Sequence, residues 1–197
     1  MNFQILKSLL VNNQIHDFRS SLGSTINLGD TEARELIQFA ETKFEKQIHR
    51  TVTIQILACV NEVPTAGNFS PDEEFVYRGC AESPKVACLT GLPATSQVNP
   101  TLSLYNHKLQ TGMSIYVSCT KSLAVAAEFA ASINGRLEVP TWIYKIKSAG
   151  GIDCKKWFYP GLELHAAEEE VVFDRLIPRE AIVGYSFMEK PNSFYSL

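Results

Sequence analysis

The chain has 197 residues, of which 45% are hydrophobic and 20% are charged, a composition ordinary for a soluble globular protein. The net charge of −3 and the pI near 5.8 give no electrostatic reason to expect nucleic acid or an anionic membrane as a partner. No apolar run is long enough to span a bilayer, and no repeat or low-complexity tract is present. The length predicts one compact domain with a substantial core.

The start of the chain and its cysteines indicate the compartment in which the protein would be found. Residues 1–11 contain a short apolar patch without a basic leading region or a small-residue cleavage site, so we expect no Sec signal peptide. The five cysteines are an odd set without a CxxC pair, which disfavours a disulfide framework or a zinc site: Cys59, Cys80, Cys88, Cys119 and Cys154. We therefore expect reduced thiols in a cytosolic setting and no metal.

The first third of the chain is predicted to be helical. Residues 2–22 carry apolar positions at helical spacing, and a turn at 27–30 precedes a second helix with Asp30 or Thr31 as its cap. Apolar residues then recur at helical spacing from Leu36 to Ile48. Residues 52–60 are rich in β-branched side chains, and the pattern leaves helix and strand open there. A loop follows at 64–71, where Gly and Pro gather.

Short strands dominate the rest of the chain. They are expected at 75–78, 115–118, 141–146, 171–173 and 182–187. An alanine-rich helix interrupts them at 122–133, and we expect Phe129 to pack in the core with Ala126 and Ala130. The sequence thus predicts an α+β protein in which a helical part, residues 1–70, packs on a β-rich core, residues 71–197, as one compact domain overall.

Three consecutive glutamates precede the strand at 171–173. If the strand begins just before them, its period of two places Glu168 and Glu170 on one face and Glu169 on the other. Paired carboxylates can catalyse a glycosidic-bond reaction, in which one stabilises a cationic sugar and the other serves the acceptor. By itself, however, such a run is more typical of a solvated edge or turn.

Further candidates lie upstream, and each also has a structural interpretation. Arg78 stands near a strand end and is followed by Gly79. Ser118 and Thr120 end another strand and lead into a helix, where capping is the ordinary explanation for hydroxyl residues. His107 is a lone histidine, and these are more often structural than functional.

In this order and spacing, the motifs resemble the Arg…Ser-x-Thr/Ser…Glu-x-Glu signature of mono-ADP-ribosyltransferases. The closest resemblance is to the catalytic chains of the cholera-toxin and heat-labile-enterotoxin group, over residues 75–187. It is carried by Tyr77-Arg78, by the stretches 104–107, 110–112 and 116–118, and by Glu168 to Val171 with Ile177-Pro178, Ile182 and Gly184-Tyr185. The resemblance implies two packed, mostly antiparallel β-sheets around a cleft for NAD.

The resemblance also implies roles for the NAD-binding residues. Arg78 would bind phosphate oxygens or brace the ribose, and Gly79 would let the backbone approach the nicotinamide carboxamide. Glu170 would stabilise the oxocarbenium-like ribose through its 2′-hydroxyl. Ser118 would position Glu170, with Thr120 as the third residue of the serine motif, and His107 would support the nicotinamide end.

The acceptor side rests on Glu168 and on a run of aromatic residues. The guanidinium of an acceptor arginine is a poor nucleophile, and a carboxylate that binds it and accepts its proton makes it competent. In the family an upstream glutamate at the position of Glu168 accompanies arginine as acceptor. The segment before it would recognise the target protein, with at least one of Trp157, Phe158 and Tyr159 exposed.

Several positions depart from the family pattern. Cys119 replaces the usual threonine inside the serine motif, and a thiol is a weak hydrogen-bond partner. Arg175-Leu176 stand where enterotoxins have paired glycines, so that turn must be built differently. The first 70 residues have no enterotoxin counterpart that we recognise.

These features favour a bacterial-toxin-like NAD:protein-arginine ADP-ribosyltransferase that uses NAD as substrate and no metal. Without a Sec signal, we expect a secreted effector or toxin that acts in the cytosol of a target cell, on a host protein, with a possible immunity or activator protein. We expect no membrane partner and no nucleic acid. Three alternatives remain open: another acceptor such as Thr, Asn or a nucleotide, an NAD glycohydrolase, and a non-catalytic binding module.

Overall fold

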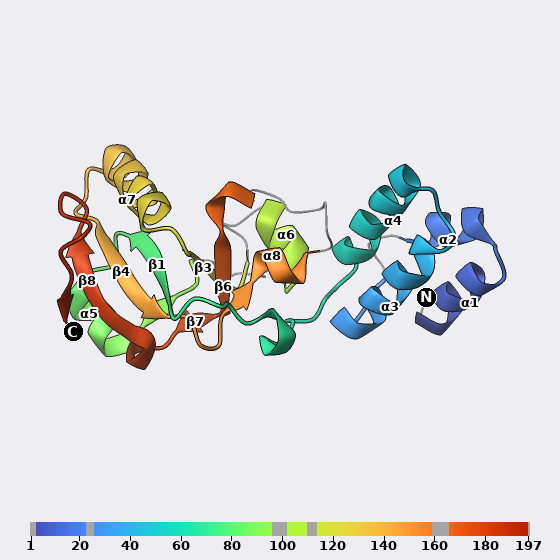
Figure 1. The fold of residues 1–197 in the computed structure, drawn as a ribbon, viewed down its shortest axis with the longest axis horizontal. Helices are drawn as coiled ribbons and strands as arrows, with labels where there is room; N and C mark the ends of the chain where they lie inside the picture. The colour runs from blue at the N-terminus through green and yellow to red at the C-terminus, as the bar shows by residue number, and fades with distance from the viewer. Residues whose placement is uncertain (1–2, 23–25, 96–101, 110–113, 159–165, 197) are drawn as a thin grey trace. The chain divides into compact units, whose positions relative to one another are not determined.

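The computed structural model describes residues 3–22, 26–95, 102–109, 114–158 and 166–196 (Figure 1). The chain divides into two compact units. The first comprises Met1–Pro64 and Val98–Ser114, and the second comprises Thr65–Gln97 and Ile115–Leu197. Residues 98–114, which the sequence analysis placed in the β-rich core, thus group with the N-terminal helices. The predicted division into residues 1–70 and 71–197, packed as one compact domain, remains a prediction.

The first unit is helical. Its elements are α1 (Phe3–Val11), α2 (Ile15–Ser21), α3 (Asp30–Glu41), α4 (Lys46–Ala58) and α6 (Leu104–Leu109). The N-cap of α3 is Gly29, whose amide donates to Glu32 Oε2 at 3.0 Å, and Asp30 is already helical. The stretch left open at 52–60 is helix as far as Ala58, and Val60 then pairs with Leu28 in an isolated bridge.

The second unit is built on antiparallel strands. Its large sheet has seven strands in the order β5-β6-β3-β1-β4-β8-β9, and β2 pairs with β7 in a separate ladder. The strands are β1 (Phe75–Cys80), β2 (Leu92–Pro93), β3 (Tyr116–Thr120), β4 (Trp142–Lys147), β5 (Ile152–Asp153), β6 (Glu170–Asp174), β7 (Leu176–Ile177), β8 (Ile182–Phe187) and β9 (Tyr195–Ser196). The helices are α5 (Pro84–Thr90), α7 (Leu123–Leu137) and α8 (Cys154–Trp157), with 3₁₀ turns η1 (Gly67–Phe69), η3 (Ala166–Glu168) and η4 (Arg179–Ala181). The predicted α+β class with a mostly antiparallel sheet is confirmed.

The large sheet consists of two well-paired halves. β3 pairs with β6 along its whole length, and β1 pairs with β4 along its whole length. By contrast, β1 and β3 share a single register pair, Tyr77 with Thr120. We call this place the seam, because here the backbone ladder between the halves is almost absent.

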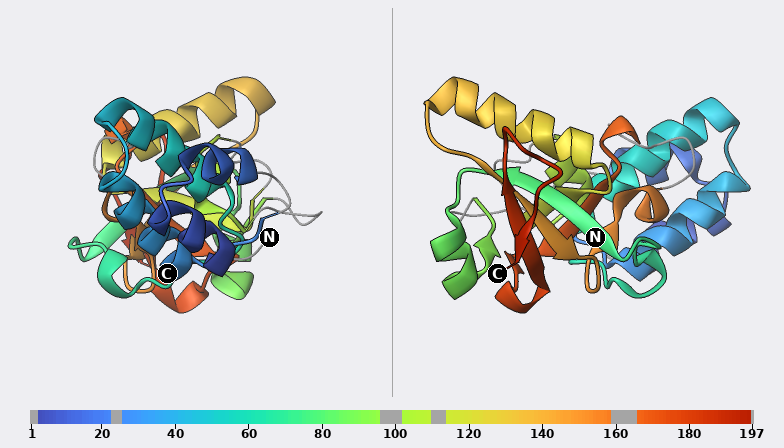
Figure 2. Two further views of the ribbon diagram at one scale, coloured as in Figure 1. Left: turned by 90° about the vertical axis from the view of Figure 1, so that its right-hand side faces the viewer. Right: turned by 60° about the vertical axis from the view of Figure 1, so that its left-hand side comes forward.

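Helix α7 packs closely on β1, as the right-hand view of Figure 2 shows. A Cβ atom on Gly79 would lie 2.2 Å from the Ala126 carbonyl oxygen and 2.7 Å from the Ala130 amide. Only small residues fit such an approach, so Ala126 and Ala130 are fully buried there. The expectation that Phe129 packs beside them is wrong: its side chain is 49% exposed.

The turn between β6 and β7 is built on Arg175, at the position where the enterotoxins have glycine. Arg175 takes a left-handed conformation with φ of 58°. Its amide donates to the Ile115 carbonyl at 2.8 Å, and its carbonyl accepts from the Ala94 amide at 2.8 Å. These two backbone bonds hold a conformation that glycine adopts without strain.

Two further observations concern the described residues. None of their helices combines the length and the apolar character needed to cross a membrane. Within the same ranges, no cluster of three or more His, Cys, Asp or Glu side chains is placed to hold a metal ion.

Candidate active site

Glu170 is the first residue of β6 and lies directly opposite Thr120 at the end of β3. Side chains of opposed residues share a face of the sheet, and alternate residues of one strand do too. Ser118, Thr120 and Glu170 therefore lie on one face, with Ser118 as a diagonal neighbour of Glu170. Thr120 and Glu170 are both buried, and Ser118 is half-buried. A carboxylate and two hydroxyls are thus collected at one end of the seam.

The hydroxyl of Thr120 also serves the helix that follows. Its Oγ1 accepts from the Ser122 amide at 3.0 Å, and the Ser122 side chain caps α7 by accepting from the Val125 amide. The prediction that hydroxyl residues cap the helix after this strand is therefore confirmed. A hydroxyl can accept and donate at once, so this bond is compatible with donation to a neighbouring carboxylate.

Cys119 faces away from these polar residues. It lies opposite Val171 and joins the apolar core with Val117 and Phe173. Burial raises the pKa of its thiol to about 12, while the Arg78 guanidinium acts to lower it and Glu170 to raise it. The thiol is therefore a neutral core group, so the departure from threonine changes the packing behind the site.

Arg78 reaches across the seam from β1. Its Nη1 donates to the backbone carbonyl of Ser118 at 2.5 Å. The side chain thus provides a hydrogen bond between β1 and β3 where the ladder has only one register pair. A guanidinium carries five N–H donors, so this bond leaves donor capacity for the oxygens of a phosphate.

The carboxylate of Glu170 also contacts a residue that the sequence analysis did not select. Cys154, the first residue of α8, donates from Sγ to Glu170 Oε2 at 3.7 Å, and both side chains are buried. A thiol is a weak donor, so the contact helps to orient the carboxylate.

The expected alternation of the three glutamates along one strand is wrong. The strand begins only at Glu170, and Glu168 ends the 3₁₀ turn η3. Between them Glu169 takes a left-handed conformation with φ of 46°. Its carbonyl accepts from the Lys121 amide at 3.2 Å, and this bond helps to fix the turn. Glu168 is half-buried at the end of η3, whereas Glu170 is buried on β6, so the two carboxylates proposed for catalysis differ in burial and in backbone support.

A family model described as Scabin-like matches residues 75–195, which is more than half of the chain. The chain belongs to the Scabin-like family. The match spans Arg78, the serine motif and the glutamates, and it ends near the last strand of the sheet. No curated protein sequence matches this Scabin-like chain.

Solved structures agree with this assignment. A guanine-specific ADP-ribosyltransferase superposes with a TM-score of 0.50 at 20% identity, over 66% of this chain and 84% of its own. A variant of the Scabin toxin from Streptomyces scabies gives a TM-score of 0.50 at 18% identity, over 68% of this chain and 82% of its own. The Scabin toxin in complex with NADH gives 0.47 at 22% identity, over 62% and 72%. By the first two of these superpositions, the Scabin-like chain has the fold of ADP-ribosyltransferase toxins, as its motifs predicted.

Two of the predicted aromatic contacts of this Scabin-like chain are buried. Trp157 is fully buried and Phe158 is 4% exposed, and their rings pack edge to face with centroids 4.9 Å apart. Neither of these two is therefore the exposed aromatic residue that the sequence analysis expected in this run. Tyr159 lies outside the described residues, and its role in acceptor recognition stays a prediction.

His107 belongs to the first unit of the Scabin-like chain. Its ring is fully buried on α6, and Nδ1 lies 2.5 Å from the Ser114 hydroxyl. That bond gives the histidine a structural role, and its expected place at the nicotinamide end stays a prediction. The neighbouring motif residues 110–112 lie outside the described ranges.

Lys121 is the main residue that the sequence analysis missed. It directly follows Thr120, and its side chain bonds carboxylates on both sides of the seam. Its position next to the serine motif was the only available signal, because its partners lie far away in the chain.

Proposed function

We propose that this Scabin-like protein is an NAD-dependent mono-ADP-ribosyltransferase, which releases nicotinamide and transfers ADP-ribose to an acceptor. The observation that carries the proposal is the strand register that makes Ser118 a neighbour of Glu170, together with the bond from Arg78 to the Ser118 carbonyl. Membership of the Scabin-like family supports it, and so does the NADH bound to the Scabin toxin.

Each residue has a chemical task in this proposal. Arg78 binds the pyrophosphate of NAD or the ribose beside it, because its planar fork matches anionic oxygens. Glu170 accepts a hydrogen bond from the ribose 2′-hydroxyl and stabilises the positive charge that develops as nicotinamide leaves. Ser118, Thr120 and Cys154 position this carboxylate.

For the acceptor, we propose arginine first. Glu168 places a second, half-buried carboxylate two residues before Glu170. A carboxylate can bind a guanidinium in bidentate fashion and take up its proton during transfer. The acceptor would then be an arginine of a target protein, and a toxin of this kind would act inside the cell that contains the target.

A guanine base is the second candidate. It is favoured by the guanine-specific ADP-ribosyltransferase that shares the fold. The net charge of −3 offers no general attraction to long nucleic acids, so a guanine acceptor would be a free nucleoside or nucleotide. In the absence of either acceptor, water would make the protein an NAD glycohydrolase.

The experiment that tests the proposal incubates the purified protein with NAD and one acceptor at a time: agmatine, guanosine or none. Nicotinamide and ADP-ribosylated products are measured by mass spectrometry, with Glu170→Gln as the inactive control. Formation of ADP-ribosyl-agmatine would support arginine as the acceptor. Formation of ADP-ribosyl-guanosine alone would show that the acceptor is guanine instead. Nicotinamide with free ADP-ribose alone would indicate a glycohydrolase. No NAD turnover would refute the enzymatic proposal and favour a binding module.

A further inference from the structure

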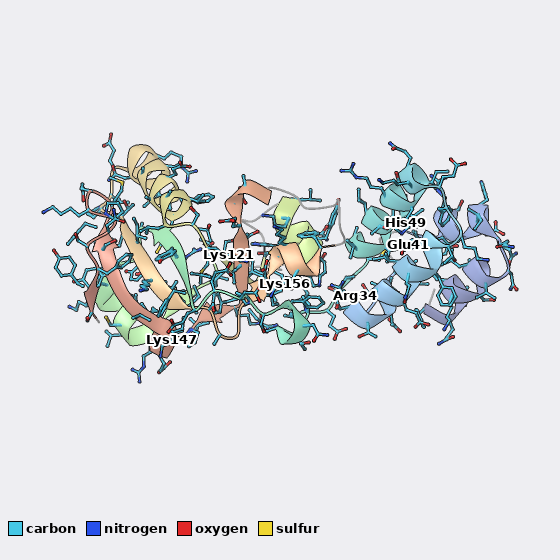
Figure 3. The ribbon with its side chains drawn as sticks, viewed as in Figure 1. Arg34, Glu41, His49, Lys121, Lys147 and Lys156 are labelled. Carbon is cyan, nitrogen blue, oxygen red and sulfur yellow. The ribbon has the colours of Figure 1, made fainter. Side chains whose placement is uncertain are left out.

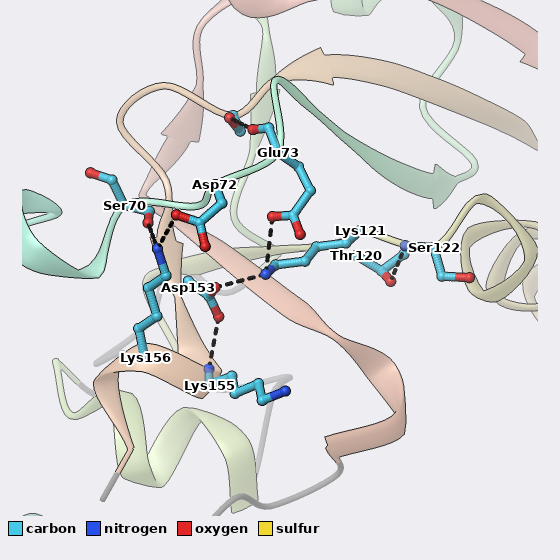
Figure 4. Close-up of polar contacts among 10 residues, drawn as sticks. Ser70, Asp72, Glu73, Thr120, Lys121, Ser122, Asp153, Lys155 and Lys156 are labelled. Carbon is cyan, nitrogen blue, oxygen red and sulfur yellow. Dashed lines mark hydrogen bonds and ion pairs between the residues drawn. The ribbon is translucent and has the colours of Figure 1, made fainter.

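Lys121 is the centre of a small ion-pair network at the end of β3 (Figures 3 and 4). Its Nζ lies 2.8 Å from Asp153 Oδ2 and 3.0 Å from Glu73 Oε2. The lysine side chain is only 14% exposed and that of Asp153 only 2%. Removing one partner of a buried ion pair leaves an uncompensated charge, so the geometry of such a pair is strongly constrained.

Asp153 has a second task in this network. It is the last residue of β5 and the N-cap of α8, where Oδ1 accepts from the Lys155 amide at 2.9 Å. One carboxylate oxygen therefore caps the helix while the other binds Lys121 (Figure 4). The position of Cys154, which contacts Glu170, is linked to Lys121 through this aspartate.

The backbone of Lys121 is tied to the glutamate turn. Its amide donates to the Glu169 carbonyl, which lies between the two proposed catalytic carboxylates. The same residue thus holds Asp153 through its side chain and Glu169 through its backbone. β5 and β6 pair over only two positions, so these extra bonds matter for the placement of both chain segments.

The third partner comes from the other side of the seam. Glu73 precedes β1, and its own carbonyl accepts from the Ser148 hydroxyl. Burial acts to raise the pKa of Glu73, but the hydrogen bond from Lys121 holds that pKa below its ordinary value. Burial likewise acts to lower the pKa of Lys121, and the bonds to Asp153 and Glu73 keep that pKa above its ordinary value. Glu73 and Lys121 are therefore charged at neutral pH.

We infer that Lys121 is a positioning residue, which holds the turn that carries Glu168 and Glu170, together with the start of α8, in place across the seam. It touches no reacting atom in this account. It acts through Glu169 and Asp153 on the carboxylates that the proposed function assigns to catalysis, so the inference rests on that function.

The chain offers a matched control in Lys156. This lysine of α8 also reaches the segment before β1, with Nζ 2.6 Å from Asp72 Oδ1 and 2.8 Å from the Ser70 carbonyl. Its side chain is 32% exposed and that of Asp72 is 80% exposed, so the pair is a solvated one. Its bonds run to Ser70 and Asp72, on the segment before β1, as Figure 4 shows.

The test measures nicotinamide release from NAD by the full chain and three variants: Lys121→Met, Lys121→Arg and Lys156→Met. Lys121→Met removes the side-chain bond to Asp153 and keeps the backbone bond to Glu169. It should lower kcat about tenfold to hundredfold with little change in the KM for NAD, because the start of α8, whose Cys154 contacts Glu170, loses its support while Arg78 stays in place. Lys121→Arg should recover most of kcat, and Lys156→Met should stay within about twofold of the wild type. Asp153→Asn keeps an oxygen for the helix cap but loses the charge, so it should follow Lys121→Met with a smaller effect.

Hydrogen exchange on the same proteins gives a readout independent of activity. Lys121→Met should accelerate exchange at the amides of residues 154–158 and 166–170, and Lys156→Met should not accelerate it at 166–170. If the wild type cleaves NAD and Lys121→Met matches it in both kcat and exchange, the inference is wrong. If the wild type cleaves no NAD, the proposed function is wrong, and the exchange data alone decide whether Lys121 holds the turn. Lys121→Met and Asp153→Asn could instead lose folded protein equally while kcat per folded molecule stays unchanged. In that case the positioning inference would be wrong, and Lys121 would only stabilise the fold.

Discussion

The two halves of the large sheet contribute different chemistry to the seam. The half formed by β1, β4, β8 and β9 brings the cation Arg78, and the half formed by β3, β5 and β6 brings Glu170, Ser118 and Thr120. Each half is well paired internally, yet only Tyr77 and Thr120 pair across the seam. In the proposed function, the binding group Arg78 and the catalytic group Glu170 would each have a well-paired strand as support, while the ladder between them is interrupted.

Side chains replace the missing backbone bonds at the seam. Arg78 donates to the Ser118 carbonyl, and Lys121 joins Glu73 to Asp153. Polar bonds of this kind place donors and carboxylates beside each other, which a continuous ladder of backbone bonds would not do. We therefore treat the two halves as separable in function, with NAD binding assigned to the Arg78 side and bond cleavage to the Glu170 side.

The largest expected effect follows from Glu170→Gln. The amide keeps the shape of the side chain but removes the negative charge that faces the developing oxocarbenium, so kcat for nicotinamide release should fall by about a thousandfold. Affinity for NAD should change little, because the phosphate-binding side is intact. Calorimetric titration of NAD into this variant separates binding from cleavage, and a normal kcat would contradict the division of roles.

Glu168→Gln tests the acceptor side of the same half. Transfer to agmatine should fall by about a hundredfold, while NAD hydrolysis by water stays within a few fold of the wild type. The ratio of the two products, measured in one reaction, is the relevant quantity. Undiminished transfer to agmatine would remove Glu168 from the mechanism, and transfer to guanosine alone would make the arginine proposal wrong.

Arg78→Lys tests the other half. Lysine keeps the charge but cannot bond the Ser118 carbonyl and a phosphate with one planar fork, so the KM for NAD should rise about tenfold with a smaller fall in kcat. Steady-state kinetics over a wide range of NAD concentrations give both values. A loss confined to kcat would mean that Arg78 takes part in bond cleavage, and it would contradict the division of binding and cleavage between the two halves.

The smallest effect is expected from Gly79→Ala, which concerns the support of β1. The added methyl group would meet the backbone of α7, so we expect a loss of about 1–3 kcal/mol in the free energy of unfolding. Chemical denaturation of the purified variant measures this loss. Normal NAD kinetics in the folded fraction would mean that Gly79 serves packing, whereas a raised KM would support the backbone contact with nicotinamide that the sequence predicted.

The sequence predicted those parts of the molecule that depend on local pattern. The strands that carry Arg78, Ser118 and Glu170 lie at the predicted places, because β-branched and aromatic residues surround each motif. The geometry of the glutamate run could not be predicted in this way. A left-handed Glu169 depends on a bond from Lys121, which is distant in the chain, and periodicity assumes that the strand continues.

Burial of the aromatic residues also depended on contacts that the sequence does not show. Trp157 and Phe158 pack on each other in the second unit, and a run of three aromatics is compatible with either exposure or burial. Phe129 shows the converse case. Its helix turns alanines toward β1 because Gly79 lets the backbones approach, so the larger side chain is displaced toward solvent. The network of Lys121 was missed because its partners lie 32 or more residues away.

The most direct test of the central claim is the release of nicotinamide from NAD by the purified wild-type protein, measured beside Glu170→Gln at the same concentration. The account predicts steady release by the wild type and almost none by the variant, although both bind NAD. Equal release by the two proteins, or no binding and no release by either, would contradict the assignment of NAD cleavage to the seam.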